Sequence, residues 1–210
     1  MICPFKTSGI AVLVASVLGI GGYLTYPLPS MAQGTEARSG SCVPALGTAR
    51  VRCDYGNGDS YIGNFVNGLP SGTGTYIYSN GDRYEGQFRL GQPNGRGQFI
   101  FKDDARVEGI FRDGKISFGT AIFVNGDRFV GQFLGGKPLG AGVFTRADGT
   151  RCSGQFFNQE LDARGSCAFA NGIRYQGEFR KGLPHGKGTI IDTSGKRFPG
   201  EFRDGQRLTR

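Results

Sequence analysis

The sequence predicts an all-β protein, an elongated, single-layer antiparallel array of about seven β-hairpin repeats that is preceded by an N-terminal signal segment. Three observations lead to this prediction. Glycine supplies 38 of the 210 residues, a Gly-x-Phe triplet recurs at near-constant spacing, and apolar and polar residues alternate around each triplet. Because an interior glycine costs a helix about 1 kcal/mol relative to alanine, this composition excludes a helical bundle.

Residues 1–32 are expected to be a signal peptide. Lys6 supplies the positive start, residues 10–20 the apolar centre, and Ser30-Met31-Ala32 the small residues that a signal peptidase reads. The alternative is an uncleaved membrane anchor, because the apolar stretch 9–26 lies at the short limit for a bilayer span. We therefore expect the protein to be exported, to the periplasm or the cell surface.

The charge balance is moderately basic. Removing Lys6 with the leader from the 25 basic residues leaves 24 against 17 acids, a formal charge of +7. Such a balance favours anionic surfaces, but the basic residues alternate with acids and form no run. Nucleic acid is therefore not an expected partner.

The chain beyond residue 52 is a tandem repeat. Seven copies at near-constant period indicate units that each pack on their neighbours. A Gly-x-Gly triplet and an Asn-Gly or Asp-Gly turn keep the same phase, as in Gly95-Arg96-Gly97 and Asn80-Gly81. The seven Gly-x-Phe triplets, at intervals of 22 or 23 residues, begin at Gly63, Gly86, Gly109, Gly131, Gly154, Gly177 and Gly200.

Each unit is predicted to be one hairpin with an aromatic face. Tyr84, Gly86 and Phe88 alternate with polar residues and should share one face of a strand. The glycines and aromatics of residues 95–101 should share the same face of the next strand, after a short polar loop over 89–94. Glycine leaves the backbone bare, so aromatic rings can lie across it.

These residues resemble the MORN (membrane occupation and recognition nexus) repeat, whose pattern is Tyr-x-Gly-x-aromatic, an Asn-Gly turn and Gly-x-Gly-x-Tyr. The match is closest over 84–97 and 175–188 and covers about 53–210, with 33–52 as a short linker and N-terminal half-repeat. The resemblance implies a row of antiparallel hairpins that acts as a scaffold or a lipid-contacting module. No catalytic domain accompanies the repeats, so we expect no enzyme.

The third unit departs from the pattern. Val107 replaces Tyr, Asp103-Asp104 replace the Asn-Gly turn, and the strand ending at Gly119 is one residue short, with Ser117 in place of Gly. We expect a local bend or weak point there. All seven units also carry Phe where the family often has Trp.

No catalytic, metal or cofactor site is predicted. The single histidine, His185, is expected in a hairpin loop, because base or metal chemistry needs convergent partners. A rival interpretation is an envelope hydrolase that uses Asp103, Asp104 and Glu108 as paired carboxylates, although solvated turn residues explain the same acids.

Four cysteines remain after Cys3 of the leader is set aside, an even number in a chain placed outside the cytosol. Cys42–Cys53 and Cys152–Cys167 are the expected disulfides, since each would join two strands of one hairpin. The alternative pairings would join cysteines several repeats apart in a linear array. Free thiols in aromatic positions remain the alternative.

A column of arginines is the candidate binding site. Each stands five residues before a repeat Phe, on the face opposite the aromatics, and would suit an anionic bilayer or an acidic polysaccharide. Glu85, Glu108, Glu178 and Glu201 lie two or four residues farther on along this face and could cancel the charge, whereas Val130 and Ser153 leave two arginines uncompensated. The column consists of Arg83, Arg106, Arg128, Arg151, Arg174 and Arg197.

The predicted function is therefore an exported, non-enzymatic scaffold or binding module at the cell envelope, whose partner is a protein or another envelope component. Contact with anionic lipid or acidic polysaccharide through the arginines is the alternative, and a solvated face is the plainest explanation of the same residues. Edge-to-edge self-association near residues 198–202 is a further expectation, because a sheet edge needs protection.

Overall fold

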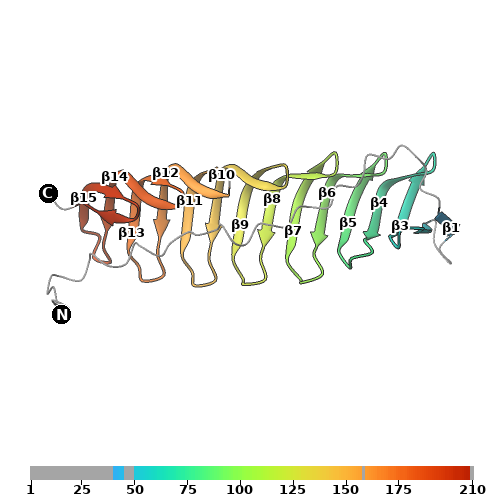
Figure 1. Ribbon diagram of the computed structural model, residues 1–210, viewed down its shortest axis with the longest axis horizontal. Helices are drawn as coiled ribbons and strands as arrows, with labels where there is room; N and C mark the ends of the chain where they lie inside the picture. Colours follow the sequence, from blue (N-terminus) through green and yellow to red (C-terminus); the bar gives the residue numbers. More distant parts are fainter. Residues whose placement is uncertain (1–39, 45–49, 158, 209–210) are drawn as a thin grey trace. The chain divides into compact units, whose positions relative to one another are not determined.

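The computed structural model describes residues 40–44, 50–157 and 159–208, and all regular structure among them is β. No helix in these ranges is long and apolar enough to cross a membrane. The predicted leader, 1–32, and most of the predicted linker lie outside the described residues. The remaining trace is grey in Figure 1.

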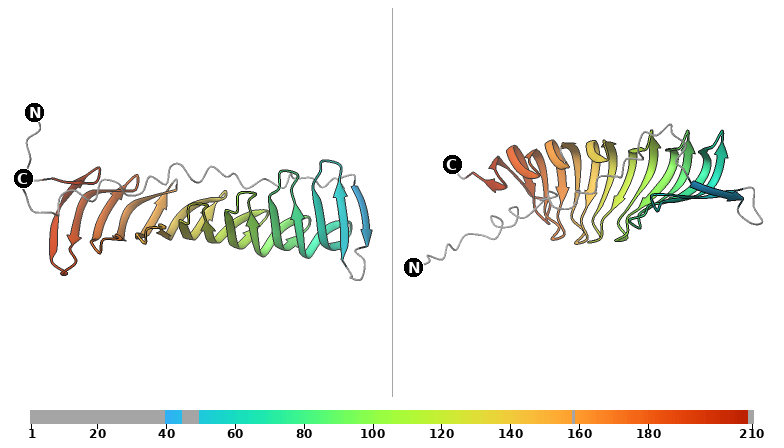
Figure 2. Two further views of the ribbon diagram at one scale, coloured as in Figure 1. Left: turned by 90° about the horizontal axis from the view of Figure 1, so that it is seen from below. Right: turned by 45° about the vertical axis from the view of Figure 1, so that its right-hand side comes forward.

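Sixteen strands form one antiparallel sheet in chain order, as Figure 1 shows. Two further views show the same succession of hairpins (Figure 2). The strands are β1 (Gly40–Pro44), β2 (Val51–Tyr55), β3 (Ser60–Val66), β4 (Leu69–Ile77), β5 (Arg83–Arg89), β6 (Gln92–Ile100), β7 (Arg106–Arg112), β8 (Lys115–Ile122), β9 (Arg128–Leu134), β10 (Lys137–Thr145), β11 (Arg151–Phe157), β12 (Glu160–Ala168), β13 (Arg174–Arg180), β14 (Leu183–Ile191), β15 (Arg197–Arg203) and β16 (Gln206–Arg207). The predicted all-β hairpin array is confirmed.

The chain divides into two compact units, and the division falls within β10. The N-terminal unit runs up to Pro138, and the C-terminal unit begins at Leu139. In each unit, neighbouring hairpins pair strand by strand, so every repeat packs on the repeats next to it.

Two kinds of turn alternate along the sheet. The turn from β5 to β6 has only two residues, Leu90 and Gly91, both at positive φ of 50° and 80°, which is the type I′ geometry that suits twisted strands. This turn is shorter than the predicted loop over 89–94. The Asn-Gly signal instead marks a three-residue loop over 79–81. The backbone N–H of Tyr78 donates to the carbonyl of Asp82 at 2.9 Å and closes this loop, in which Gly81 has φ 94°.

Side chains of each hairpin alternate between two faces. On β5, Tyr84 and Phe88 are buried, whereas Arg83, Glu85 and Gln87 are exposed. We call the aromatic side the inner face and the arginine side the outer face. This alternation confirms the predicted hairpin pattern.

The tyrosine of each complete repeat connects two repeats on the inner face. The ring centroid of Tyr84 lies 5.1 Å from that of Phe88 and 4.9 Å from that of Phe111 in the next repeat, both edge-to-face. Its hydroxyl donates to the carbonyl of Gln87 at 3.1 Å. The backbone of Gly97 lies beneath this ring, where a Cβ would overlap the phenol. Glycine is required here by the close approach, as predicted.

Two repeats without an aromatic residue at the tyrosine position fill the same space from the partner strand. Val107 and Cys152 replace tyrosine, and in these two repeats Ile116 and Leu161 stand where other repeats have proline. Ile116 is 2% exposed and Leu161 is fully buried. The inner face is therefore filled although the residue types differ.

The irregular third repeat keeps its pairing. β8 contains eight residues where the other long strands contain nine, and a smaller bulge absorbs the difference. Ser117 lies in this bulge and donates from its hydroxyl to the carbonyl of Ile110 at 3.0 Å. Asp104, at φ 68°, takes the positive-φ position that glycine has in other turns. The pairing of β8 with β7 and β9 is continuous across the expected weak point.

Candidate anion-binding face

All six predicted arginines are exposed, and each is the first residue of an odd-numbered strand from β5 to β15. Their position is set by the turn that precedes each strand, because the three-residue loop returns every repeat to the same register. Within each unit, successive arginines are two strands apart, a spacing of roughly 9–10 Å. Each unit therefore presents three arginines in a row on its outer face.

In the N-terminal unit, two of the three arginines have a glutamate two residues farther on, and one of these glutamates forms an ion pair. Arg83 and Glu85, two residues apart on β5, form an ion pair with Nε and Oε1 at 2.9 Å. Glu108 has the same position after Arg106. Arg128 instead donates to Thr120 Oγ1 at 3.4 Å.

The C-terminal unit lacks carboxylates at this position. Ser153, Gln176 and Pro199 follow its three arginines by two residues. Arg151 donates weakly to Thr145 Oγ1 at 3.5 Å. Among the described residues, Arg151, Arg174 and Arg197 have no carboxylate within 4.0 Å. Across the described part of the chain, five of the six arginines have no carboxylate within 4.0 Å, and the three of the C-terminal unit also have no acid two residues farther on.

Two glutamates of the C-terminal unit, Glu178 and Glu201, lie on the outer face four residues after Arg174 and Arg197. Glu178 stands opposite Arg164 on β12, and Glu201 opposite Lys187 on β14. Neither pair comes within 4.0 Å, although both are directly opposed across neighbouring strands. These acids therefore do not neutralise Arg174 or Arg197.

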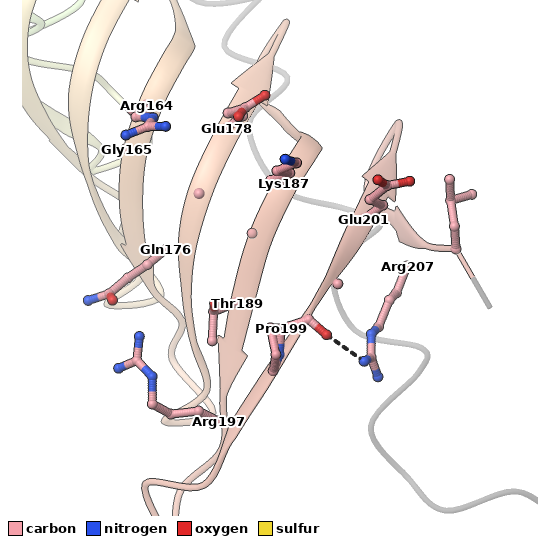
Figure 3. A pocket seen from close by; sticks show the side chains of 14 residues that line it. Arg164, Gly165, Gln176, Glu178, Lys187, Thr189, Arg197, Pro199, Glu201 and Arg207 are labelled. Atoms are coloured by element: carbon pink, nitrogen blue, oxygen red, sulfur yellow. Dashed lines mark hydrogen bonds between the residues drawn. The ribbon is translucent and has the colours of Figure 1, made fainter. Parts of the chain in front are cut away.

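A shallow groove of about 820 Å³ runs across β12–β16 between these rows of side chains. Figure 3 shows Arg164, Glu178, Lys187 and Glu201 on one side, and Gln176, Thr189, Pro199 and Arg197 on the other. Between the rows the floor is the backbone of glycines, including Gly177, Gly188 and Gly200. The outer face of the C-terminal unit is thus hollowed, and four cations and two carboxylates line the hollow.

The last described residues close one end of this groove. Arg207 donates from Nη2 to the carbonyl of Pro199 at 2.7 Å (Figure 3), and the N–H of Leu208 donates to the carbonyl of Glu201 at 2.8 Å. Pro199 has no N–H to offer. The part of β15 for which self-association was expected therefore has two carbonyls already bonded and one donor missing, an arrangement that protects an edge strand.

Comparison with known families identifies the repeat. The MORN repeat model matches residues 61–83, 84–106, 129–151 and 175–197. This chain is a MORN repeat protein. MORN repeats are typical of binding and scaffold modules, in agreement with a site that consists of an exposed face. The third and fifth repeats, in which Val107 and Cys152 replace tyrosine, are not matched.

Solved structures are similar to this chain at low identity. The chain is similar to the SAS-4 (dCPAP) TCP domain of Drosophila melanogaster, solved in complex with a proline-rich motif of Ana2 (dSTIL), with 11% identity, TM-score 0.52, and coverage of 78% of this chain and 90% of that chain. The TCP10c domain of Drosophila melanogaster Sas-4 matches at 14% identity and TM-score 0.41, covering 79% of this chain and all of that chain. A comparison with curated proteins gives no match.

Four cysteines of this MORN repeat protein form two disulfides. Sγ of Cys42 is bonded to that of Cys53 at 1.97 Å, and Sγ of Cys152 to that of Cys167 at 2.07 Å. Each bond joins directly opposed residues of neighbouring strands. These are the two local pairs that the repeat phase suggested.

The other candidate residues do not converge. His185 lies within β14 rather than in a loop, and its Nδ1 is 3.6 Å from Oδ1 of Asp204. The Arg180 guanidinium, which donates to Asp204 at 3.0 Å, holds the pKa of that carboxyl below its ordinary value. Strand β14 continues through the predicted loop because the type I′ turn ends at Gly182.

The acids of the rival hydrolase interpretation serve the third repeat locally. Asp103 accepts the N–H of Ala105 at 3.2 Å inside its own turn, and Glu108 lies on the outer face of β7. Neither lines the groove. Within the described residues, no group of three or more His, Cys, Asp or Glu side chains is placed to hold a metal ion.

Three cations of the groove were not predicted. Arg164, Lys187 and Arg207 lie on the even-numbered strands, whereas the sequence search followed the odd-numbered ones. A signal existed, since Arg164 and Lys187 fall in phase with each other two strands apart. The register of β12 against β13 places Arg164 beside Glu178, and that of β14 against β15 places Lys187 beside Glu201.

Proposed function

We propose that this MORN repeat protein is an exported, non-enzymatic binding module of the cell envelope whose outer face contacts anionic material, either an anionic bilayer surface or an acidic polysaccharide. The observation that carries the proposal is the row of three exposed arginines in the C-terminal unit, which have no carboxylate within 4.0 Å among the described residues. Guanidinium groups present planar forked donors that suit phosphate and carboxylate.

The regular spacing of the arginines supports a repeating ligand. Arg151, Arg174 and Arg197 follow one another every second strand, so a surface or polymer with many anionic groups could engage them together. The two disulfides favour an oxidising compartment outside the cytosol. No cofactor enters this proposal.

The experiment is cosedimentation of the protein with vesicles and with an acidic polysaccharide. Vesicles of phosphatidylglycerol and phosphatidylcholine are compared with phosphatidylcholine alone, at low and high salt. We expect retention by the anionic material only, and its loss at high salt, because surface charge is screened within about 10 Å at 0.1 M ionic strength. Equal, salt-insensitive retention by neutral vesicles would overturn the proposal.

Variants locate the contact. Arg151→Ser with Arg174→Ser and Arg197→Ser should abolish most of the anionic retention. The matched control, Arg83→Ser with Arg106→Ser and Arg128→Ser, removes the same charge from the N-terminal unit, where a carboxylate already pairs with Arg83. We expect a clearly smaller loss in this control. An equal loss in both triple variants would assign the effect to net charge rather than to the arginine row of the C-terminal unit.

A further inference from the structure

We propose that the groove across β12–β16 is a binding site for an acidic saccharide unit, a ligand that combines hydroxyl groups with a carboxylate or phosphate. The inference rests on the proposed function and names the ligand class for one part of the outer face. It depends on three observations: the unpaired cations of the groove, the carboxylates between them, and the bare floor.

The cations surround the groove and leave their charge available. Arg164 and Lys187 lie along one side, Arg197 on the other, and Arg207 at the end (Figure 3). None of the four has a carboxylate within 4.0 Å among the described residues. Arg207 is held in place by the carbonyl of Pro199 at 2.7 Å, which leaves its remaining N–H groups for a ligand. A ligand with an anionic group would supply the partner that these four cations do not have among the described residues.

The two carboxylates determine what else the ligand must carry. Glu178 and Glu201 alternate with the cations along one side of the groove. A ligand that is only anionic would be repelled by them, whereas ionised carboxylates accept hydrogen bonds and need donors. Hydroxyl groups supply such donors without adding positive charge. A saccharide with acidic groups satisfies the cations and the carboxylates together.

The floor of the groove fits a flat ring. A Cβ at Gly177 or Gly188 would point to the inner face, toward Tyr175, so these residues present only backbone to the groove. Pro199 and Leu208 offer apolar surface for the C–H groups of a sugar. The volume of about 820 Å³ lies within the range of small-ligand pockets. The groove therefore has space, apolar contact and polar partners for a saccharide unit.

Calorimetric titration of the whole protein tests the inference with three soluble probes. The first is a tetrasaccharide of uronic acid, the second a neutral hexose tetrasaccharide, and the third tripolyphosphate, which carries charge without hydroxyl groups. We expect the uronic acid probe to bind at least about tenfold more tightly than the neutral one, since charge-assisted hydrogen bonds are the stronger kind. Equal affinity for the acidic and neutral tetrasaccharides would overturn the inference.

The variants avoid the arginine column, so that the two proposals can fail separately. Lys187→Gln with Arg207→Gln should weaken binding of the uronic acid probe about tenfold or more. Arg96→Gln with Arg112→Gln removes two exposed cations from the N-terminal unit and should leave it unchanged. All changed residues are at the surface, and an unchanged melting temperature shows that each variant is folded.

The carboxylates give a result of opposite sign. Glu178→Ala with Glu201→Ala should weaken binding of the uronic acid probe about fivefold or more, because two acceptors for hydroxyl groups are lost. The same variant should bind tripolyphosphate more tightly, because two repelling charges are gone. Tighter binding of both probes would overturn the inference and leave the proposed function standing, whereas no binding to any anionic material would reject both.

The source of the ligand follows from one more probe. The soluble headgroup inositol phosphate carries the same combination of hydroxyl groups and charge. If it competes with the uronic acid probe in the wild-type groove, the inference is supported with a lipid headgroup as source. If the uronic acid tetrasaccharide alone binds, the inference is supported with an acidic polysaccharide as source.

Discussion

Two neighbouring hairpins of the C-terminal unit, β11–β12 and β13–β14, fill equivalent spaces on the inner face in different ways. Each has one large and one small residue at the tyrosine and proline positions, and the large residue stands at a different one of the two positions in each hairpin. In β13–β14 the large Tyr175 lies over the glycines and the small Pro184 faces Phe179. In β11–β12 the small Cys152 stands at the tyrosine position and Leu161 at the proline position. Tyr175 and Leu161 are both fully buried. The repeat therefore conserves the filled volume over its glycines rather than the residues that fill it.

Truncation of the larger partner should have the greatest effect on this arrangement. Leu161→Ala removes a fully buried side chain and is expected to lower the free energy of unfolding by about 3–4 kcal/mol, because a cavity remains. Pro184→Ala, at the matched position beside Tyr175, should cost only about 1.5 kcal/mol. Denaturant titration measures both losses. Equal losses would contradict the inference that the proline position fills the inner face in β11–β12 but not in β13–β14.

Loss of the Cys152–Cys167 disulfide should come next. Cys152→Ser with Cys167→Ser is expected to cost about 3 kcal/mol, since the bond closes a loop of 15 residues. Hydrogen exchange of the β11 and β12 amides reports the loss locally. The β13–β14 hairpin holds its strands without such a bond, so its amides should change less. A uniform increase of exchange in both hairpins would show that the bond stabilises the whole unit instead.

A methyl group under the tyrosine should have a smaller effect. Gly188→Ala places a Cβ against the phenol of Tyr175, and we expect a loss of about 2 kcal/mol through overpacking. Gly188 is absent from the positive-φ residues, so backbone strain adds nothing. Adding Tyr175→Val to Gly188→Ala should recover part of the loss in denaturant titration. An additive result for the double variant would show that the ring and the methyl group do not compete.

Removal of one hydroxyl is the mildest test. Burial raises the pKa of Tyr175, the one tyrosine of the C-terminal unit, to about 12. The unfolded phenol ionises near pH 10, so the folded state holds this proton more tightly. Its stabilising contribution is full below about pH 10 and is lost as the pH rises from about 10 to about 12.

The variant Tyr175→Phe should therefore flatten the alkaline part of the stability profile of the C-terminal unit. At neutral pH it should cost about 1 kcal/mol, because the hydrogen bond to the carbonyl of Glu178 is lost. Unfolding followed by circular dichroism between pH 8 and 12 measures both effects. An unchanged alkaline slope would assign that slope to other groups.

Much of the fold was predictable because it repeats. Glycine and phenylalanine positions fixed the phase, and period-two alternation separated Tyr84 from Glu85 onto opposite faces. Alternation could not predict that the large residue is Tyr175 in one hairpin and Leu161, at the proline position, in the other. That prediction requires knowing that the tyrosine and proline positions, nine residues apart on two strands, face one space. The bulge in each hairpin, which sets that register, has no signal in single-strand patterns.

The arginine column was predictable, and its partners were only partly so. Position five before each Phe correctly placed Arg83 and Arg197 at the exposed start of a strand. Whether an acid cancels an arginine depends on the row in which that acid lies, and the rows of Glu85 and Glu201 differ. The groove depends on the register of five strands, β12–β16, so single strands could not reveal it.

The reciprocal sizes at the tyrosine and proline positions constrain the order in which such a repeat can change. If proline became leucine first, tyrosine and leucine would compete for the space above one glycine pair. If tyrosine became cysteine first, a void would open, but a second cysteine opposite could cross-link across it, as Cys152 and Cys167 do. The second order is the gentler mutational path. A disulfide such as Cys152–Cys167 therefore holds the two strands together while the large side chain moves from the tyrosine position to the proline position.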